Sequence, residues 1–413
     1  MNKITKIKAR QVLDSRGNPT IECEIFTNKS KGSAIVPSGA STGKYEALEV
    51  RDKEKAYHGK SVLKAINNIN KIISPKLIGK EITKQEEIDK LLDYLDGTPN
   101  KSNLGANATL AVSLGSAVAA SNTLNKPLYK YLGNKLNLPI PFCNIINGGR
   151  HSEGDLKIQE FMIAPVKAKS FSEATQMVAE IYYTLKQNIE DKYGKLSTHV
   201  GDEGGFAPPI KSPYEALDLI SKAIEENNYK ENVKIALDAA ASEFYTGTQY
   251  QVESEKSLNS NKLIEYYKDL IKKYPIISLE DPFDQDDFEA YKELRKKLKI
   301  QIVGDDLLVT NKDRINHAVK QKLCNCLLLK VNQIGTLTEA LEAFKTASKA
   351  GWNTMVSHRS GETEDTFISD LSVSLGCGQI KLGAPCRGER TAKFNRLLRI
   401  EEELGKKAKY SKF

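Results

Sequence analysis

Short apolar runs that end on a polar or charged side chain recur through the second half of the chain. From Glu280 onward, the ends of successive runs lie 25, 25, 28 and 23 residues apart, and each gap contains one stretch with helical periodicity. A strand, a turn and a helix fill such a length, so the repeat predicts a parallel, TIM-like α/β barrel. In these barrels the active site forms where the strands end, and we expect the terminal side chains to meet there. They are Asp238, Glu280, Asp305, Lys330, His358 and Lys381.

The first part of the chain has a different pattern. Ile21, Cys23 and Ile25 alternate with glutamates within residues 4–36, and the cluster at 15–19 is typical of a turn. This pattern predicts an antiparallel meander of strands.

Helical periodicity follows the meander and also separates the barrel strands. An Ala-, Ser- and Gly-rich stretch at 107–124 predicts a helix packed closely on its neighbours. Ser212 to Glu215 has the pattern of a capping box with proline at the first helical position. We expect further amphipathic helices on the outside of the barrel. The expected helices span about 62–73, 88–95, 261–273, 286–298, 335–349 and 387–404, and the expected domains are an α+β domain at 1–135 and the barrel at 136–413.

Composition narrows the class of protein. The 413 residues include no apolar stretch of membrane-spanning length, and the N-terminus lacks a signal-peptide core. The six cysteines have no zinc-like spacing, so we expect reduced thiols and a cytoplasmic protein. The net charge is +8, but the lysines are dispersed, which fits a small anionic substrate better than a nucleic-acid or membrane partner.

Three of the expected strand ends, Asp238, Glu280 and Asp305, carry carboxylates. Three acids at one barrel mouth repel each other unless a cation lies between them, and all-oxygen ligation suits Mg²⁺. The alternative is that they cap helices or pair with lysines. Convergence of all three favours the metal.

Lys330 ends a strongly apolar run, where burial is expected to lower the pKa of its ammonium group and make it a base. The alternative is a side chain that extends to solvent from a strand end. Lys381 would lower this pKa further, and Arg359 and Ser360 beside His358 are donors suited to a phosphate or carboxylate. Together with a metal, these groups are suited to removing a proton next to a carboxylate through an enediolate.

Three loops have unusual composition. Residues 37–47 (PSGASTGKYEA) lack the spacing of a phosphate-binding P-loop and are either a solvated loop or a lid that closes on a ligand. Residues 146–161 carry His151, Gln159 and Glu160, and 199–208 carry Glu203 among glycines. Such acids are usually solvated, but the glycines would let the backbone approach a ligand closely.

Long motifs in the same order make the chain resemble the enolase family, the phosphopyruvate hydratases. They include VPSGASTG, NGGRH, IQEFMIAP, GDEGGFAP, SLEDPF, GDDLLVT, LLLKVNQIGT, SHRSGETEDTFI and IKLGAP. The resemblance implies an enolase-type barrel and reversible dehydration of 2-phosphoglycerate to phosphoenolpyruvate in glycolysis and gluconeogenesis. It also implies that Lys330 removes the C2 proton, and that Glu203, assisted by Glu160, protonates the departing hydroxyl.

The same resemblance implies two Mg²⁺ ions per active site. Asp238, Glu280 and Asp305 would hold the first, and Ser41 would bind the second with the substrate. Arg359 and Ser360 would hold the phosphate. The residues implied to contact the substrate or its surroundings are His151, Gln159, His358 and Lys381.

Family resemblance further implies a homodimer, in which Arg10 and Glu22 pair with Glu402 and Arg399 of a second copy. Two other functions stay open from the sequence: a racemase or cycloisomerase of the same superfamily, and a non-catalytic interaction protein. The paired GDEGG and SHRSG loops argue against the first, and the presence of Lys330, Glu203 and the metal carboxylates argues against the second.

Overall fold

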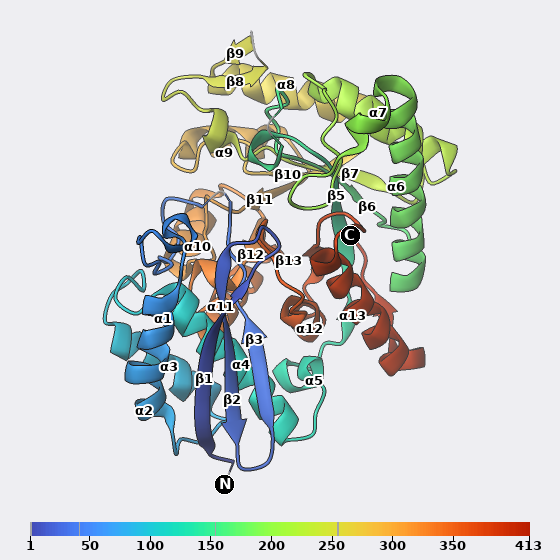
Figure 1. Ribbon diagram of the computed structural model, residues 1–413. Helices are drawn as coiled ribbons and strands as arrows, with labels where there is room; N and C mark the ends of the chain where they lie inside the picture. Colours follow the sequence, from blue (N-terminus) through green and yellow to red (C-terminus); the bar gives the residue numbers. More distant parts are fainter. Residues whose placement is uncertain (1, 41, 153, 254–255) are drawn as a thin grey trace.

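The computed structural model describes residues 2–40, 42–152, 154–253 and 256–413 (Figure 1). The N-terminal domain opens with an antiparallel meander, as predicted. Its alternating Ile21, Cys23 and Ile25 are fully buried against the helices that follow. The strands are β1 (Ile4–Leu13), β2 (Pro19–Thr27) and β3 (Lys31–Ile35).

Helix α4 is the centre of this domain and contacts both β2 and β3. A Cβ atom on Gly32 of β3 would lie 2.2 Å from the backbone nitrogen of Ala119, so a larger residue would separate strand and helix. The close packing predicted for 107–124 is therefore confirmed. The helices are α1 (Leu63–Asn68), α2 (Ser74–Leu77), α3 (Gln85–Asp96), α4 (Ala106–Thr123) and α5 (Leu128–Leu132).

Eight strands of the described chain close into a barrel, in the order β10-β11-β12-β13-β14-β5-β6-β7. The expectation of a fully parallel barrel is wrong at β6, which runs antiparallel to β5 and β7, because β5 returns through a loop instead of a crossover helix. The strands are β5 (Ile140–Asn147), β6 (Glu160–Ala164), β7 (Lys234–Asp238), β10 (Ile276–Glu280), β11 (Gln301–Gly304), β12 (Cys326–Leu329), β13 (Asn353–Ser357) and β14 (Gly378–Lys381).

Helices surround the barrel, and those expected at 261–273, 286–298, 335–349 and 387–404 are confirmed within two residues. The capping box at Ser212 is not formed: its side chain makes no cap bond, and Glu215 instead accepts from Lys192 and Tyr193. The helices are α6 (Phe171–Tyr193), α7 (Pro213–Glu226), α8 (Ser260–Lys273), α9 (Phe288–Lys297), α10 (Lys312–Gln321), α11 (Leu337–Lys349), α12 (Phe367–Leu375) and α13 (Gly388–Leu404).

Short strand pairs complete the elements. Strand β4 pairs with β15 next to the barrel, and β8 pairs with β9 in a hairpin beside α8. No helix in the described ranges is both long and apolar enough to cross a bilayer. These strands are β4 (Asn137–Leu138), β8 (Tyr250–Glu253), β9 (Lys256–Leu258) and β15 (Lys409–Tyr410).

Inward-facing side chains of the barrel lead directly to its rim. Phe142, Ala236, Val303 and Leu328 belong to a buried cluster separate from the outer core. Because side chains alternate between the faces of a strand, the residue two positions further on faces the same way. Those residues are Asn144, Asp238, Asp305 and Lys330.

Because β6 runs opposite to its neighbours β5 and β7, its first residue lies at the rim where those strands end. Glu160, its first residue, is in register with Asp238 at the end of β7 and with Asn147 at the end of β5. In a parallel β6, Glu160 would lie at the opposite end of the barrel.

The N-terminal domain packs on the barrel through α3 and α4, which contact α11 (Figure 1). Lys101 is buried there, and its Nζ lies 2.9 Å from Glu339 and 3.0 Å from Asp93. This packing holds the segment after β3 against the barrel rim, where Ser38 and Gly361 exchange backbone hydrogen bonds of 2.8 and 2.9 Å.

Candidate active site

Two buried lysines at the rim are held by the carboxylates predicted as metal ligands. Lys330 Nζ lies 2.5 Å from Asp305 Oδ2. Lys381 Nζ lies 2.9 Å from both Asp238 and Glu280, and 3.0 Å from Glu160. The strand ends therefore converge as the pattern predicted.

The expected lowering of the Lys330 pKa is wrong in this structure. Burial, Arg359 and Lys381 do act to lower the pKa of Lys330, but Asp305 at its ammonium group outweighs them, and the net pKa lies above its usual value. Lys381 has a pKa well above its usual value for the same reason, because Asp238, Glu160 and Glu280 outweigh its burial.

The carboxylate set fits a divalent cation. Burial and the neighbouring Asp238 raise the pKa of Glu280 well above its usual value. Its Oε2 atom is buried and accepts no hydrogen bond from any described residue. A buried carboxylate oxygen that no protein donor satisfies is costly unless a cation engages it. Asp238, Glu280 and Asp305 could therefore hold a metal ion.

Asp281 and Asp306 form a second close acidic group with Asp305, with one oxygen of each within 4.8 Å of the others. Asp281 already accepts from the backbone nitrogens of Asp305 and Asp306 at 3.0 and 2.6 Å and from Tyr291 at 3.2 Å. It therefore organises the loop that carries Asp305. Burial and the nearby Asp305 and Asp238 raise its pKa to about 7.

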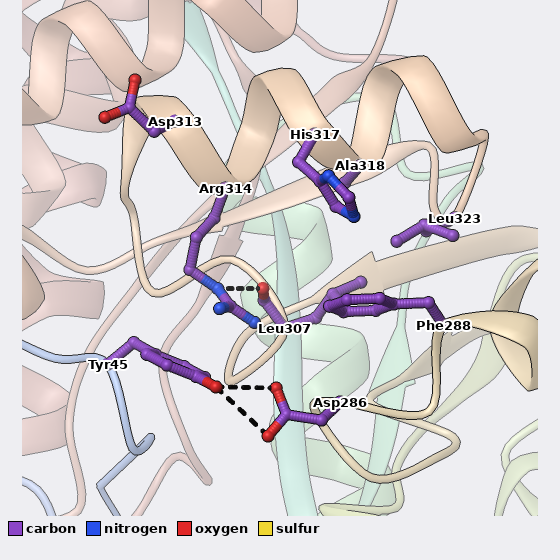
Figure 2. A pocket seen from close by; sticks show the side chains of 9 residues that line it. All are labelled: Tyr45, Asp286, Phe288, Leu307, Asp313, Arg314, His317, Ala318 and Leu323. Atoms are coloured by element: carbon purple, nitrogen blue, oxygen red, sulfur yellow. Dashed lines mark hydrogen bonds between the residues drawn. The ribbon is translucent and has the colours of Figure 1, made fainter.

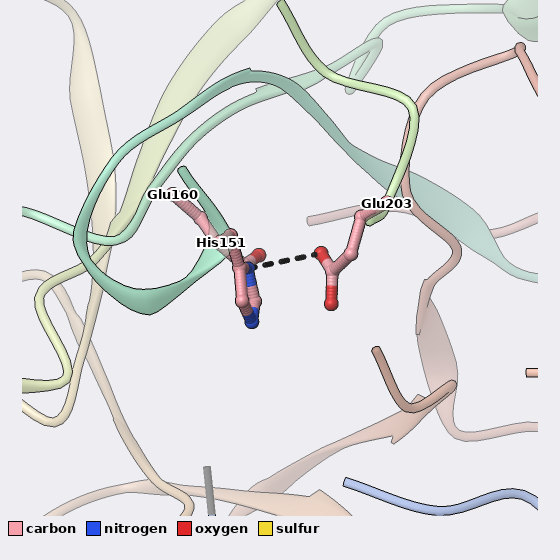
Figure 3. A group of neighbouring side chains, drawn as sticks. All are labelled: His151, Glu160 and Glu203. Carbon is pink, nitrogen blue, oxygen red and sulfur yellow. Dashed lines mark ion pairs between the residues drawn. The ribbon is translucent and has the colours of Figure 1, made fainter. Parts of the chain in front are cut away.

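Opposite Lys330, His151 lies between two glutamates (Figure 3). Its Nδ1 is 3.6 Å from Glu160 Oε1 and 3.7 Å from Glu203 Oε2. Burial and Glu203 raise the pKa of Glu160 well above its usual value. Burial acts in the same direction on Glu203, but His358, His151 and Arg390 outweigh it and hold the pKa of Glu203 well below its usual value. Of the two carboxyl groups, Glu160 therefore holds a proton more readily than Glu203.

Glycines next to Glu203 serve a different purpose from the one expected. A Cβ on Gly205 would lie 2.4 Å from Asn147 Oδ1 and 3.0 Å from the Asn144 carbonyl oxygen. The close approach is to β5 of the protein itself. It places Glu203 where Asn144 Nδ2 donates to its Oε2 at 3.1 Å.

The predicted anion donors contact the segment at 37–47. Arg359 donates to Glu46 and to Asn332, and the backbone nitrogen of Ala40 donates to Ser360 Oγ at 2.6 Å. His358 is buried beside them, with its Nε2 3.4 Å from Glu203 Oε2. Gln159 is buried at the start of β6, and its backbone nitrogen donates to Asp238.

The segment at 37–47 covers the rim as a lid and is fixed on its outer side by Tyr45 (Figure 2). The Tyr45 hydroxyl donates to Asp286 at 2.9 Å, and the Arg314 guanidinium lies 3.9 Å from the centre of its ring. Of the two alternatives for this segment, the lid is favoured. Ser41, predicted to bind a second metal, lies outside the described residues.

The comparison with known families agrees with this geometry. One family model, the N-terminal domain of enolase, matches residues 4–132, and a second, the C-terminal TIM barrel domain of enolase, matches 135–412. The chain belongs to the enolase family. Curated enolases cover nearly the whole chain: that of Methanocaldococcus jannaschii is 57% identical over 98% of this chain and 96% of its own. The enolase of Methanococcus vannielii is 55% identical, and the match covers 97% of this chain and 95% of the relative. The enolase of Pyrococcus furiosus is also 55% identical, and the match covers 99% of this chain and 97% of the relative.

Membership in the enolase family makes the protein a phosphopyruvate hydratase, a hydro-lyase. It also implies a divalent metal, and the acidic clusters at the rim, such as Asp281, Asp305 and Asp306, fit metal binding. The resemblance of the sequence to enolases is thereby confirmed, as is the class of fold.

Sequence reasoning missed four side chains that organise this enolase site: Glu46, Asn144, Asp281 and Arg390. Arg390 had a detectable signal. The buried face of α13 runs through Phe394, Leu397 and Ile400, and helical spacing extends it back to Arg390. Asn144 continues the inward side of β5, whereas Glu46 and Asp281 meet their partners only through the tertiary fold.

Two of the residues expected at an enolase dimer interface, Arg10 and Glu22, pair with each other within the chain. Arg10 forms ion pairs with Glu22 and Glu24 across β1 and β2. Their pairing with Glu402 and Arg399 of a second copy stays a prediction.

Proposed function

We propose that the protein catalyses the Mg²⁺-dependent, reversible dehydration of 2-phospho-D-glycerate to phosphoenolpyruvate, as a cytoplasmic step of glycolysis and gluconeogenesis. One observation carries the proposal. Lys330 follows β12 and Glu160 begins β6, and these strands are four positions apart in the eight-stranded barrel order. A base and an acid pair therefore face each other across the barrel mouth, with the carboxylate set between them.

In the proposed mechanism Asp238, Glu280 and Asp305 would hold one Mg²⁺, and Ser41 would help to hold a second together with the substrate. The ions supply electrostatic stabilisation of the enediolate dianion. Lys381, which already contacts Asp238, Glu280 and Glu160, adds a positive charge to the same region.

Lys330 removes the C2 proton. Lys330 must be neutral to do so, and its ion pair with Asp305 opposes this. When Asp305 is engaged elsewhere, burial, Arg359 and Lys381 are left to lower the pKa of Lys330 towards that of a usable base.

Glu203 protonates the departing 3-hydroxyl, so that it leaves as water. Because the pKa of Glu160 is raised and that of Glu203 is lowered, we assign Glu160 as the source of this proton and Glu203 as the group that delivers it. Oxygens of the two carboxylates lie within 4.8 Å of each other beside His151, close enough for such an exchange once the substrate hydroxyl lies between them.

Binding groups surround this axis. Arg359 and Ser360 hold the phosphate, and His151, Gln159, His358 and Lys381 contact the substrate or fix the groups that do. The proposal includes a homodimer and a domain boundary at residue 135, which lies between α5 and β4.

The test is direct. Purified protein with Mg²⁺ and 2-phosphoglycerate should produce the ultraviolet absorbance of phosphoenolpyruvate, and a chelator should stop the reaction until Mg²⁺ is restored. Absence of product at saturating metal and substrate would contradict the proposal.

A further inference from the structure

Arg390 is a fully buried arginine at the start of α13, and its guanidinium reaches two loops of the site. It donates to the carbonyl oxygens of Arg359 and Ser360 at 2.5 Å each, and to that of Asp202 at 3.0 Å. A fourth contact joins its Nη1 to His358 Nδ1 at 2.6 Å. The first loop carries the anion donors, and the second carries Glu203.

The contact with His358 fixes which nitrogen of the imidazole carries the proton. A guanidinium group can only donate hydrogen bonds, so Nδ1 of His358 must be the acceptor. The ring proton is therefore on Nε2, the nitrogen that faces Glu203 Oε2 at 3.4 Å. Protonation of Nδ1 would place an N–H group against the N–H of Arg390, which opposes formation of an imidazolium.

The fold makes special room for this contact. Gly383 follows β14 with a φ of +80°, and a Cβ atom there would lie 3.0 Å from His358 Cε1 and 3.1 Å from Arg390 Cδ. The same Cβ would lie 2.6 Å from the Glu203 carbonyl oxygen. A residue with a side chain at 383 would separate the three groups.

We infer that Arg390 is a positioning residue for proton delivery: it holds His358 as the neutral Nε2–H form, which keeps the Glu203 carboxyl aimed at the substrate hydroxyl. The inference rests on the proposed role of Glu203. Lys330 follows β12, away from these contacts, so removal of the C2 proton should not depend on Arg390 in the same way.

Lys393 provides a matched control on the same helix. It is also buried and ties the same loop, through Glu362 and the carbonyl oxygen of Thr363, both at 2.6 Å. Within the part of the chain that the structure describes, Lys393 forms no hydrogen bond or ion pair with His358. A purely structural role for Arg390 would give Arg390→Lys and Lys393→Gln the same pattern of defects.

The first experiment compares two rates in the Mg²⁺-loaded enzyme: exchange of the C2 proton of 2-phosphoglycerate with solvent deuterium, and formation of phosphoenolpyruvate. Arg390→Lys should lower dehydration by about 100-fold, as expected for a displaced catalytic group, while exchange falls much less. Lys393→Gln should leave the ratio of the two rates unchanged. Equal loss of both rates in Arg390→Lys would overturn the inference.

A double-mutant cycle adds a second test. If Arg390 acts through His358, Arg390→Lys should have little further effect on dehydration in a His358→Gln background. If the double mutant instead loses dehydration activity by the product of the two single losses, that result would count against the inference.

The tautomer can be measured in the wild-type holoenzyme, even if Arg390→Lys does not fold. The chain has five histidines, so the ¹⁵N signals of His358 can be assigned by their loss in His358→Gln. They should show a protonated Nε2 and an unprotonated Nδ1 from pH 6 to 9. The charged groups facing this ring are Glu203, Arg390 and Glu362. The opposite tautomer, or an imidazolium at pH 7, would refute the inference. Inactive wild-type enzyme with the expected tautomer would instead contradict the proposed function.

Discussion

Arg359 and Glu46 form a buried bidentate pair at the barrel mouth. Nη1 of Arg359 lies 2.9 Å from Glu46 Oε2, and its Nη2 lies 3.2 Å from Glu46 Oε1. An acid of the lid therefore engages the guanidinium that we assign to the phosphate. Closure of the lid and binding of the anion therefore use the same group, the guanidinium of Arg359.

Replacement of Glu46 should separate these effects. In Glu46→Gln the negative charge beside Arg359 is removed, so inorganic phosphate should bind about tenfold more tightly. The lid loses its anchor, so kcat should fall. Titration calorimetry with phosphate measures the first effect, and Glu243→Gln, which alters an exposed pair with Arg150, is the control. Weaker phosphate binding by Glu46→Gln would argue against assigning Arg359 to the phosphate.

Lys330 and Glu203 should affect different half-reactions. Lys330→Ala should lower exchange of the C2 proton by about 10²–10⁴-fold, because it removes the base. Glu203→Gln should retain measurable exchange while dehydration is lost. NMR of 2-phosphoglycerate in deuterated buffer measures exchange. Equal loss of exchange in both variants would contradict the assignment of base and acid.

The contacts of Tyr45 should influence substrate affinity from outside the site. Tyr45→Phe removes the hydrogen bond to Asp286 but keeps the stacking of Arg314, so KM should rise about threefold. Tyr45→Ala removes both and should raise KM more. Steady-state kinetics checks this order, with Tyr94→Phe, at an 82% exposed tyrosine, as the control. An unchanged KM in Tyr45→Ala would mean that the contacts of Tyr45 with Asp286 and Arg314 do not limit closure of the lid.

His358 should make the folded protein sensitive to acid. Burial, together with the nearby Arg390, lowers the pKa of His358 from 6.5 to about 4 despite the opposing effect of Glu203. Between these values the unfolded chain binds a proton that the folded protein does not. This contribution to stability is therefore complete above pH 6.5 and is lost as the pH falls towards 4, by about 3 kcal/mol. As the pH is lowered from 7 to 4.5, the melting temperature of the wild type should fall more steeply than that of His358→Gln. Parallel pH dependence of the two proteins would show that His358 is not responsible.

Lys101 should stabilise the contact between the domains. Lys101→Met leaves Glu339 and Asp93 without their shared cation, and burial already raises the pKa of Glu339. We expect a loss of about 2 kcal/mol, less than for a fully buried pair because both acids are partly exposed. Denaturant unfolding measures this loss. Lys84→Met, which removes an exposed pair with Glu87, is the control, and an equal change in both variants would exclude an interface role.

Much of the barrel could be predicted because it depends on local periodicity. Apolar runs indicated the positions of the strands. Because side chains alternate between the two faces of a strand, the same runs placed Asp238, Asp305 and Lys330 on the inward side. The same alternation holds for Cys326, which lies in the barrel interior. The alternation does not extend to Cys324, because β12 begins only at Cys326, and Cys324 packs in the outer core.

Features that depend on tertiary contacts could not be predicted from the pattern. The direction of β6 follows from the return of the chain after β5, and a run of apolar residues reads alike in both directions. The pKa of Lys330 depends on how close Asp305 approaches, a distance that no spacing in the sequence contains. Helical spacing places Arg390 on the buried face of α13, but its contact with His358 depends on the tertiary fold.

Closure of the barrel also has a consequence for biosynthesis. The last strand, β14, pairs with β5, joining residues 378–381 to 140–142. Lys381 ends β14, the last barrel strand in chain order, and Arg390 follows it, so a ribosome must synthesise all eight barrel strands before the site can be assembled. Partial products of translation are therefore inactive, and until release they expose the unpaired edges of β5 and of the most recently made strand to chaperones.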